Sequence, residues 1–172
     1  MGALADKLLR LSPLETAALI VFAASAALFG AWVFEALGFL PCELCLKQRI
    51  PYYFGVPLAL IMSCVAQRGP RGLIIAGFGA LALLFAASAG LGAWHAGVEW
   101  GFWKGPTACT GASLPAAGGN LLEQLKDFKV VRCDEVAIRI IGLSLAGWNA
   151  LVSLGIAALA GRAAYGSSTE SQ

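Results

Sequence analysis

The chain has 172 residues, of which 59% are hydrophobic and only 13% are charged. A soluble domain carries about 25% charged residues, and a chain this short has too much surface for its volume to hide the shortage in a core. The net charge of +2 is too small to indicate a nucleic-acid partner. The composition therefore indicates one integral membrane domain and argues against a nucleic-acid-binding protein.

Four apolar runs are long enough to cross a bilayer as helices, which takes roughly 17–25 residues. In chain order they are 16–34, 50–66, 73–94 and 140–160, with charges only at their edges. They predict an all-α, four-transmembrane-helix bundle that forms a single domain over residues 1–172. The first run could instead be a cleaved signal peptide, but it is longer than the usual signal core of about 7–15 residues, so an uncleaved helix is favoured.

Four spans place both termini on one side of the membrane. Basic residues stand in the N-terminal tail, the tight turn 67–72 and the C-terminal tail, namely Lys7, Arg10, Arg68, Arg71 and Arg162. The positive-inside rule therefore predicts cytoplasmic termini. The loops 35–49 and 95–139 then face away from the cytoplasm.

The first outer loop contains the motif Cys42-Glu43-Leu44-Cys45, just before the second run. A C-x-x-C pair forms a small ring when oxidised, exchanges readily with other thiols and often has a depressed pKa. Lys47, Arg49 and the start of the second helix favour the thiolate, whereas Glu43 opposes it. We interpret the motif as a redox-active pair.

Two other interpretations of the motif stay open. A structural disulfide needs no further residue, whereas a zinc site needs two more ligands at matching spacing. The sequence shows neither a second C-x-x-C nor a nearby histidine pair. Redox chemistry is preferred over both alternatives. Four of the five cysteines fall on the predicted outer side, where disulfides persist, which agrees with the topology predicted from charge.

Cys109 and Cys133 lie in the second outer loop, too far apart for a local redox ring. Alone they fit a structural disulfide and an exchangeable one equally well, and the C-x-x-C on the same side favours a relay. Between them, residues 120–129 predict a short amphipathic helix with Asn120 as its N-cap, which lies at the membrane interface or packs on the rest of the loop. Cys64, inside the second run, is expected to be a small buried hydrophobic residue.

A thiol relay in a membrane needs a second electron carrier. The chain has no dinucleotide-binding loop, haem motif or iron–sulfur spacing, and a lipid-soluble quinone requires none of these. Arg49 at the start of the second run and His95 at the end of the third are candidates for the quinone site. Each also has a simpler interpretation: Arg49 as a flanking charge, and His95 as a capping or pairing residue at the interface.

At this point the residues match a known family. The segment from Pro41 to Arg49 resembles the C-x-L-C-x-x-x-R motif of the DsbB family, bacterial inner-membrane quinone reductases that reoxidise the periplasmic dithiol oxidase DsbA. The segment from His95 through Trp103 to Cys109 is similar to the family's second periplasmic loop. With four spans and a second cysteine pair, the resemblance covers nearly the whole chain. Glu43 departs from the family motif, because it places an acid between the two cysteines, where an apolar residue would fit better.

The resemblance implies an enzyme that generates disulfides and carries electrons from thiols to a quinone, with its redox loops facing the periplasm. A DsbA-like partner attacks the disulfide between Cys109 and Cys133, and a mixed disulfide forms at Cys109. Cys133 then exchanges with Cys42.

On the membrane side the resemblance implies that Cys45, freed as a thiolate, passes electrons to ubiquinone or menaquinone. Arg49 supports the quinone and that thiolate, and His95 is a weaker candidate for the quinone pocket. No metal is expected.

Two rival functions remain. A protein like vitamin K epoxide reductase also pairs a C-x-x-C with four helices and a quinone-type ligand, but there the motif lies late in the chain, whereas here it precedes the second run. A tetraspan scaffold or small transporter would use the cysteines for structural disulfides. Charges inside the spans would support a transporter, and the four runs have none.

Overall fold

The computed structural model describes residues 11–106, 132–136 and 138–169. Four long helices dominate it: α2 (Pro13–Ala36), α3 (Glu43–Arg68), α4 (Arg71–Glu99) and α7 (Leu145–Thr169). Each is long and apolar enough to cross a membrane, with a mean hydropathy of 1.2 to 2.2 over its best window. The prediction of an all-α membrane protein with four spans is confirmed.

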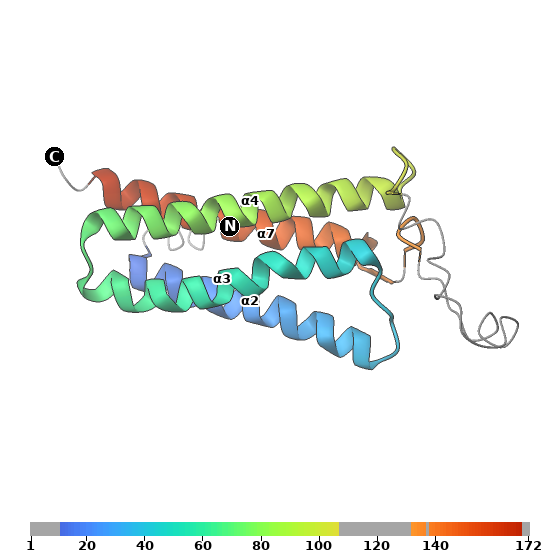
Figure 1. Cartoon of the computed structure of the whole chain (residues 1–172), viewed down its shortest axis with the longest axis horizontal. Helices are drawn as coiled ribbons and strands as arrows, with labels where there is room; N and C mark the ends of the chain where they lie inside the picture. The colour runs from blue at the N-terminus through green and yellow to red at the C-terminus, as the bar shows by residue number, and fades with distance from the viewer. Residues whose placement is uncertain (1–10, 107–131, 137, 170–172) are drawn as a thin grey trace, which may run out of the picture.

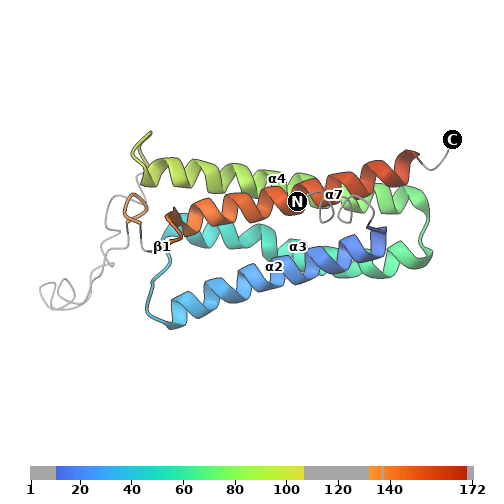
Figure 2. The ribbon, with the colours of Figure 1, turned by 180° about the vertical axis from the view of Figure 1, so that it is seen from behind.

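The four helices lie side by side and form a closed bundle (Figures 1 and 2). In sequence order α2 packs on α3, α3 on α4 and α4 on α7, and α7 returns to contact α2. The tight turn between α3 and α4 lies at one end of the bundle. The turn between α2 and α3, which precedes the C-x-x-C motif, lies at the other (Figure 1).

Three helices, α2, α3 and α4, extend beyond the predicted apolar runs at both ends. Ser12 caps α2 through a capping box, accepting a hydrogen bond from the Glu15 amide while the Glu15 carboxylate accepts one from the Ser12 amide. A glycine with φ of +93°, Gly38, follows the end of α2 and reverses the chain direction.

The start of α3 differs from the prediction. The apolar run begins at Ile50, but the helix begins at Glu43 with Cys42 as its N-cap. The Cys42 sulfur accepts a hydrogen bond from the Cys45 amide at 3.3 Å, which satisfies one of the free donors of the first turn. The C-x-x-C pair is therefore part of a helix terminus and not of a free loop.

The start of the fourth span also differs. A helix from Ile140 was predicted, but Arg139–Ile140 (β1) and Leu143–Ser144 (β2) form a small antiparallel hairpin. Its turn residues Ile141 and Gly142 have φ of +54° and +81°, which breaks any helix there. The helix α7 begins only at Leu145.

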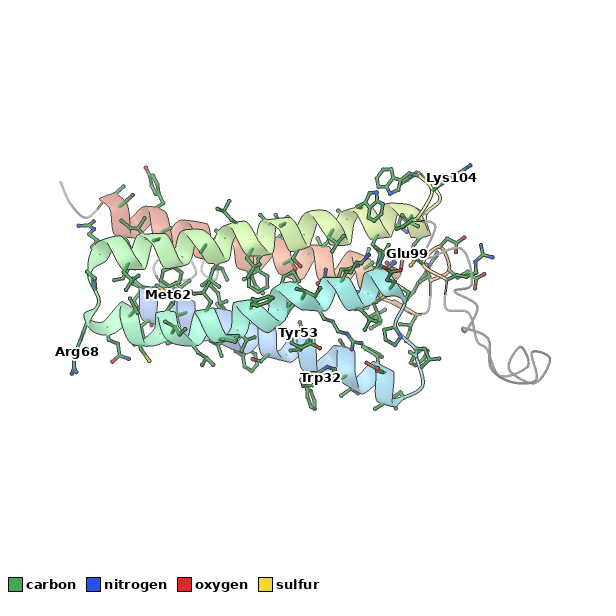
Figure 3. All side chains as sticks on the ribbon, viewed as in Figure 1. Trp32, Tyr53, Met62, Arg68, Glu99 and Lys104 are labelled. Atoms are coloured by element: carbon green, nitrogen blue, oxygen red, sulfur yellow. The ribbon has the colours of Figure 1, made fainter. Side chains whose placement is uncertain are left out.

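The bundle core is small and tightly packed. Its buried side chains include Ile20, Met62, Phe78, Leu81 and Phe85. The outer faces carry exposed apolar side chains, as expected for helices that contact lipid. Figure 3 shows Met62 between α3 and α4, with Arg68 and Glu99 at opposite ends of the bundle.

Candidate active site

The two cysteines of the C-x-x-C motif lie at the N-terminus of α3. Both are free thiols, and their sulfur atoms lie 2.9 Å apart. Cys42 is 5% exposed, while Cys45 is half-buried in the first turn of the helix. The short sulfur–sulfur distance allows the two cysteines to form and break a disulfide without a movement of the helix backbone.

His95 approaches the pair from α4. Its ring is 1% exposed, with Nε2 3.7 Å from the Cys42 sulfur. On the other side of the ring, Nδ1 lies 2.6 Å from the buried Gln48 amide nitrogen. When the Gln48 amide donates to Nδ1, the proton of the neutral imidazole sits on Nε2 and points at the Cys42 sulfur.

These neighbours favour the thiolate of Cys42. Its pKa is held well below the ordinary value of a thiol, mainly by the hydrogen bond with the Cys45 side chain. Burial opposes this shift, while His95 and the Cys45 amide add to it. Cys42 is therefore the activated sulfur on this face of the pair.

A carboxylate completes the same cluster. Glu99 lies one helical turn beyond His95, and its Oε1 is 4.0 Å from His95 Nε2. The Glu99 side chain is 7% exposed, and its Oε2 has no hydrogen-bond partner among the described residues. Figure 3 shows Glu99 at the end of α4, beside the start of α3.

Cys45 faces a different space. A cavity of about 340 Å³ opens between α2, α3 and α7. Cys45, Gln48, Arg49 and Tyr52 line it from α3, and most of its remaining wall is apolar. Neither Cys42 nor His95 is among the described lining residues. The two sulfurs of the motif therefore lie in different environments: Cys42 contacts His95, and Cys45 lines the cavity.

Arg49 carries the positive charge of this cavity. Its guanidinium pairs with Glu35 Oε2 at 2.6 Å and donates to the Ala31 carbonyl at 3.4 Å. Both contacts come from the last turns of α2, so Arg49 is anchored across the α2–α3 interface. Only 12% of its side chain is exposed.

Polar groups also line the wall of the cavity formed by α3 and α7. The Tyr52 hydroxyl donates to Asn149 Oδ1 at 2.6 Å and lies 2.9 Å from the Ser153 hydroxyl, which itself donates to Ser88. The Asn149 amide nitrogen is buried and has no partner among the described residues. This nitrogen lies toward Gly92 of α4, so the Asn149 side chain joins the wall of the cavity to the α4–α7 interface.

The remaining cysteines occupy distinct positions. Cys133 is 1% exposed, packs with Cys42 and Leu44 in one buried cluster, and is disulfide-bonded. Its partner is none of Cys42, Cys45 and Cys64, which are free. Cys109 and the predicted helix 120–129 lie outside the described residues. Cys64 is exposed on the bundle surface, so the expectation that it is buried was wrong; it lies on the outward face of α3.

Sequence reasoning selected Cys42, Cys45, Arg49 and His95, and the structure brings these four to one end of the bundle. It places Arg49 with Cys45 at the cavity, whereas His95 lies against Cys42. Gln48 and Glu99 were missed. Their helical spacing was the available signal, since Gln48 follows Cys45 by three residues and Glu99 follows His95 by four.

Fold and site together define a multi-pass membrane protein with a dithiol centre at one end of a four-helix bundle. The family described as "Disulfide bond formation protein DsbB" matches residues 14–163. The chain therefore belongs to the DsbB family and is a membrane-spanning oxidoreductase of disulfide bond formation.

Individual relatives agree with this assignment. The chain is 28% identical to "Disulfide bond formation protein B" of Saccharophagus degradans, covering 89% of this chain and 94% of that protein. It is 31% identical to the protein of the same name from an Azoarcus species, covering 82% and 86% respectively. No solved structure gives a significant match.

Proposed function

We propose that this protein is a thiol:quinone oxidoreductase that reoxidises a DsbA-like dithiol oxidase and passes the electrons to a membrane quinone. The observation that carries this proposal is the division of the C-x-x-C pair. Cys45 lines an apolar cavity beside Arg49, while Cys42 packs against Cys133. One sulfur thus faces a space suited to a lipid-soluble ligand and the other faces a cysteine suited to exchange.

On the aqueous side the relay is a series of thiolate attacks on disulfides. The partner's thiolate attacks Cys109 and frees Cys133, which attacks Cys42 of the oxidised pair and frees Cys45. The partner's second thiolate then closes its own disulfide and releases Cys109. Cys109 displaces Cys42 from Cys133 and restores the loop disulfide. The partner loses two electrons and two protons, and Cys42 and Cys45 hold the two electrons.

On the membrane side the cavity fits a quinone. Its volume of about 340 Å³ lies at the lower end of ligand pockets, and apolar walls with few polar groups are typical of such sites. A bound quinone would accept the two electrons together with two protons. Arg49 supplies a positive charge beside Cys45. His95 and Gln48 hold Cys42, 2.9 Å away, ready to close the disulfide with Cys45.

We further propose that the end of the bundle carrying Cys42 faces the periplasm and that the protein lies in the bacterial inner membrane with cytoplasmic termini. The opposite end carries Arg68 in the tight turn, and Arg71 and Arg162 nearby, which supports this orientation. A DsbA-like partner would then meet the site from the periplasm, where disulfides persist.

Thiol trapping in reconstituted vesicles tests the proposal. A reduced DsbA-like dithiol protein should become oxidised only when quinone is present, and Cys45→Ser should abolish this. Cys109→Ala should block oxidation of that protein while a small dithiol still reduces quinone. Cys64→Ala serves as the matched control, with turnover like the wild type. Quinone-dependent oxidation that survives Cys45→Ser would refute the assigned role of Cys45.

A further inference from the structure

We propose that the reduced site binds a thiophilic divalent cation such as Zn²⁺, with Cys42, Cys45, His95 and Glu99 as its ligands. The sulfur atoms of the two cysteines and a ring nitrogen of His95 all lie within 4.8 Å of one another. The C-x-x-C motif alone offers two of the four ligands that a zinc site needs. The fold supplies His95 and Glu99 by bringing the end of α4 against the start of α3.

The ligand types and distances suit a tetrahedral ion. With Zn–S near 2.3 Å and Zn–N near 2.0–2.1 Å, a sulfur and a nitrogen ligand stand about 3.6 Å apart and two sulfur ligands about 3.8 Å apart. Cys42 Sγ and His95 Nε2 already lie 3.7 Å apart. The two sulfurs must separate from 2.9 Å, and Cys45, which borders the cavity, has room to turn its side chain.

Glu99 supplies the fourth ligand. Its Oε1 lies 4.0 Å from His95 Nε2, whereas oxygen and nitrogen ligands of one tetrahedral ion stand about 3.4 Å apart, so the Glu99 side chain must move toward the ring by roughly half an ångström to bind the ion. Its other oxygen is buried without a hydrogen-bond partner among the described residues. A buried carboxylate oxygen without a partner is costly, and a cation between Glu99 and the two sulfurs would remove that cost.

Gln48 provides the outer support that a histidine ligand needs. A ring that binds metal through Nε2 carries its proton on Nδ1 and donates it to a neighbouring acceptor. The Gln48 amide lies 2.6 Å from Nδ1 and can present its oxygen by a half-turn of the amide. The same residue therefore serves the metal-free ring and the metal-bound ring.

Binding would depend on the redox state of the pair. A Cys42–Cys45 disulfide has no thiolates to offer, so only the reduced form binds the ion. Both thiolates are then held by the ion, so the pair is not free to give its electrons to a quinone and close the Cys42–Cys45 disulfide. This last step rests on the proposed function: the cation would hold the reduced enzyme inactive until it is removed.

Metal titration of the full-length protein in detergent tests the site. In a Cys109→Ser, Cys133→Ser chain reduced with a phosphine, Cd²⁺ should give sulfur-to-metal charge-transfer absorbance at one ion per chain, and Zn²⁺ should compete for it. The disulfide form should give none. His95→Ala and Glu99→Gln should each weaken binding at least about tenfold. Cys64→Ala should bind like its parent, since Cys64 is exposed elsewhere on α3.

The outcomes separate the inference from the relay itself. No binding, or binding unchanged by the combined His95→Ala and Glu99→Gln substitution, would overturn the four-ligand site, because a reduced C-x-x-C alone chelates metal. Folding of each variant is verified by helical circular dichroism, with His95→Gln as the substitute if His95→Ala does not fold. The titration uses neither quinone nor partner, so its result tests the metal site even if the relay assay gives no quinone-dependent oxidation. In the wild type, Zn²⁺ should slow turnover and a chelator should restore it.

Discussion

The two cysteines of the C-x-x-C motif differ chemically because one helical turn gives them different neighbours. Cys42 caps the helix and accepts from the Cys45 amide, with His95 on its far side. Cys45 sits inside the first turn and faces the cavity. A motif that looks symmetric in the sequence thus has one sulfur that is activated by His95 and the Cys45 amide and one that lines an apolar cavity.

The first prediction concerns the pH dependence of Cys42. In a Cys45→Ser, Cys64→Ala chain kept free of metal, Cys42 is the single free thiol. Because its pKa is lowered, it should be mostly thiolate at about pH 7, where an ordinary thiol is only a few per cent ionised. Ultraviolet thiolate absorbance should disappear only as the pH falls through the lowered pKa.

His95→Ala in the same chain is the informative comparison. It removes the ring nitrogen 3.7 Å from the sulfur, so the titration midpoint should rise toward about 8.5. The serine at position 45 keeps a hydroxyl donor in both chains. An unchanged midpoint would show that His95 does not support the thiolate.

The second prediction concerns the ion pair that holds Arg49. Glu35→Gln keeps the side-chain shape but removes the charge 2.6 Å from the guanidinium, so Arg49 loses its anchor on α2. Charged hydrogen bonds of this kind are worth about 1.5–3 kcal/mol, so the quinone KM should rise by about tenfold with a smaller change in kcat. The measurement is quinone-dependent oxidation of a small dithiol, with Glu135→Gln, which pairs with Arg132 on the surface, as the control.

The sequence showed which residues lie together where the signal was local, but not where their proximity depends on packing between helices. Cys42, Cys45 and Arg49 follow one another on one helix, so their spacing alone brings them together. His95 was a weaker candidate for the quinone pocket, and its contact with Cys42 could not be predicted, because the direction of the ring depends on how α4 packs on α3. Glu99 was missed because a charge at a helix end looks like an ordinary flank in the sequence.

At the scale of elements, the existence of each helix followed from the apolar runs, but the ends did not. A hydropathy run stops at the first charge, whereas α3 continues through Glu43 to its cap at Cys42. The hairpin before α7 has apolar residues, so hydropathy counted it as part of the span. Gly142 was the only local sign of the turn.

The third prediction concerns the α4–α7 interface. A Cβ at Gly92 would lie about 3 Å from the backbone of α7, at the Ala150 nitrogen and the Ala146 oxygen, and backbone cannot yield as a side chain can. Gly92→Ala should therefore separate α4 from α7 and destabilise the bundle by about 1–3 kcal/mol.

Gly90→Ala is the matched control, because no other side chain lies within 4 Å of the place that a Cβ would take there. It should leave stability unchanged or slightly raised, as alanine favours the helix. Denaturant-induced unfolding in mixed micelles, followed by helical circular dichroism, compares the two. Equal stability of the two variants would contradict close packing at Gly92.

At the scale of the whole molecule, composition indicated a membrane protein, because a chain this short with 13% charged residues exposes too much apolar surface for water, and the apolar runs then gave the four spans. The long-range arrangement became visible only in the folded chain. Cys133, far along the chain from the motif, packs on Cys42 only because the segment before α7 returns to the start of α3. The spacing of the cysteines in the sequence does not show that these two segments pack together.

The last prediction concerns orientation in the membrane. Lys104 follows α4 at the end of the bundle that carries Glu99, and Arg68 marks the opposite end (Figure 3). In a chain whose five cysteines are replaced by serine, Lys104→Cys should react with a membrane-impermeant maleimide in intact spheroplasts. Gln67→Cys, exposed beside Arg68, should react only after lysis. The reverse pattern would turn the dithiol site toward the cytoplasm, where a reducing thiol pool would keep Cys42 and Cys45 reduced and a periplasmic relay would be impossible.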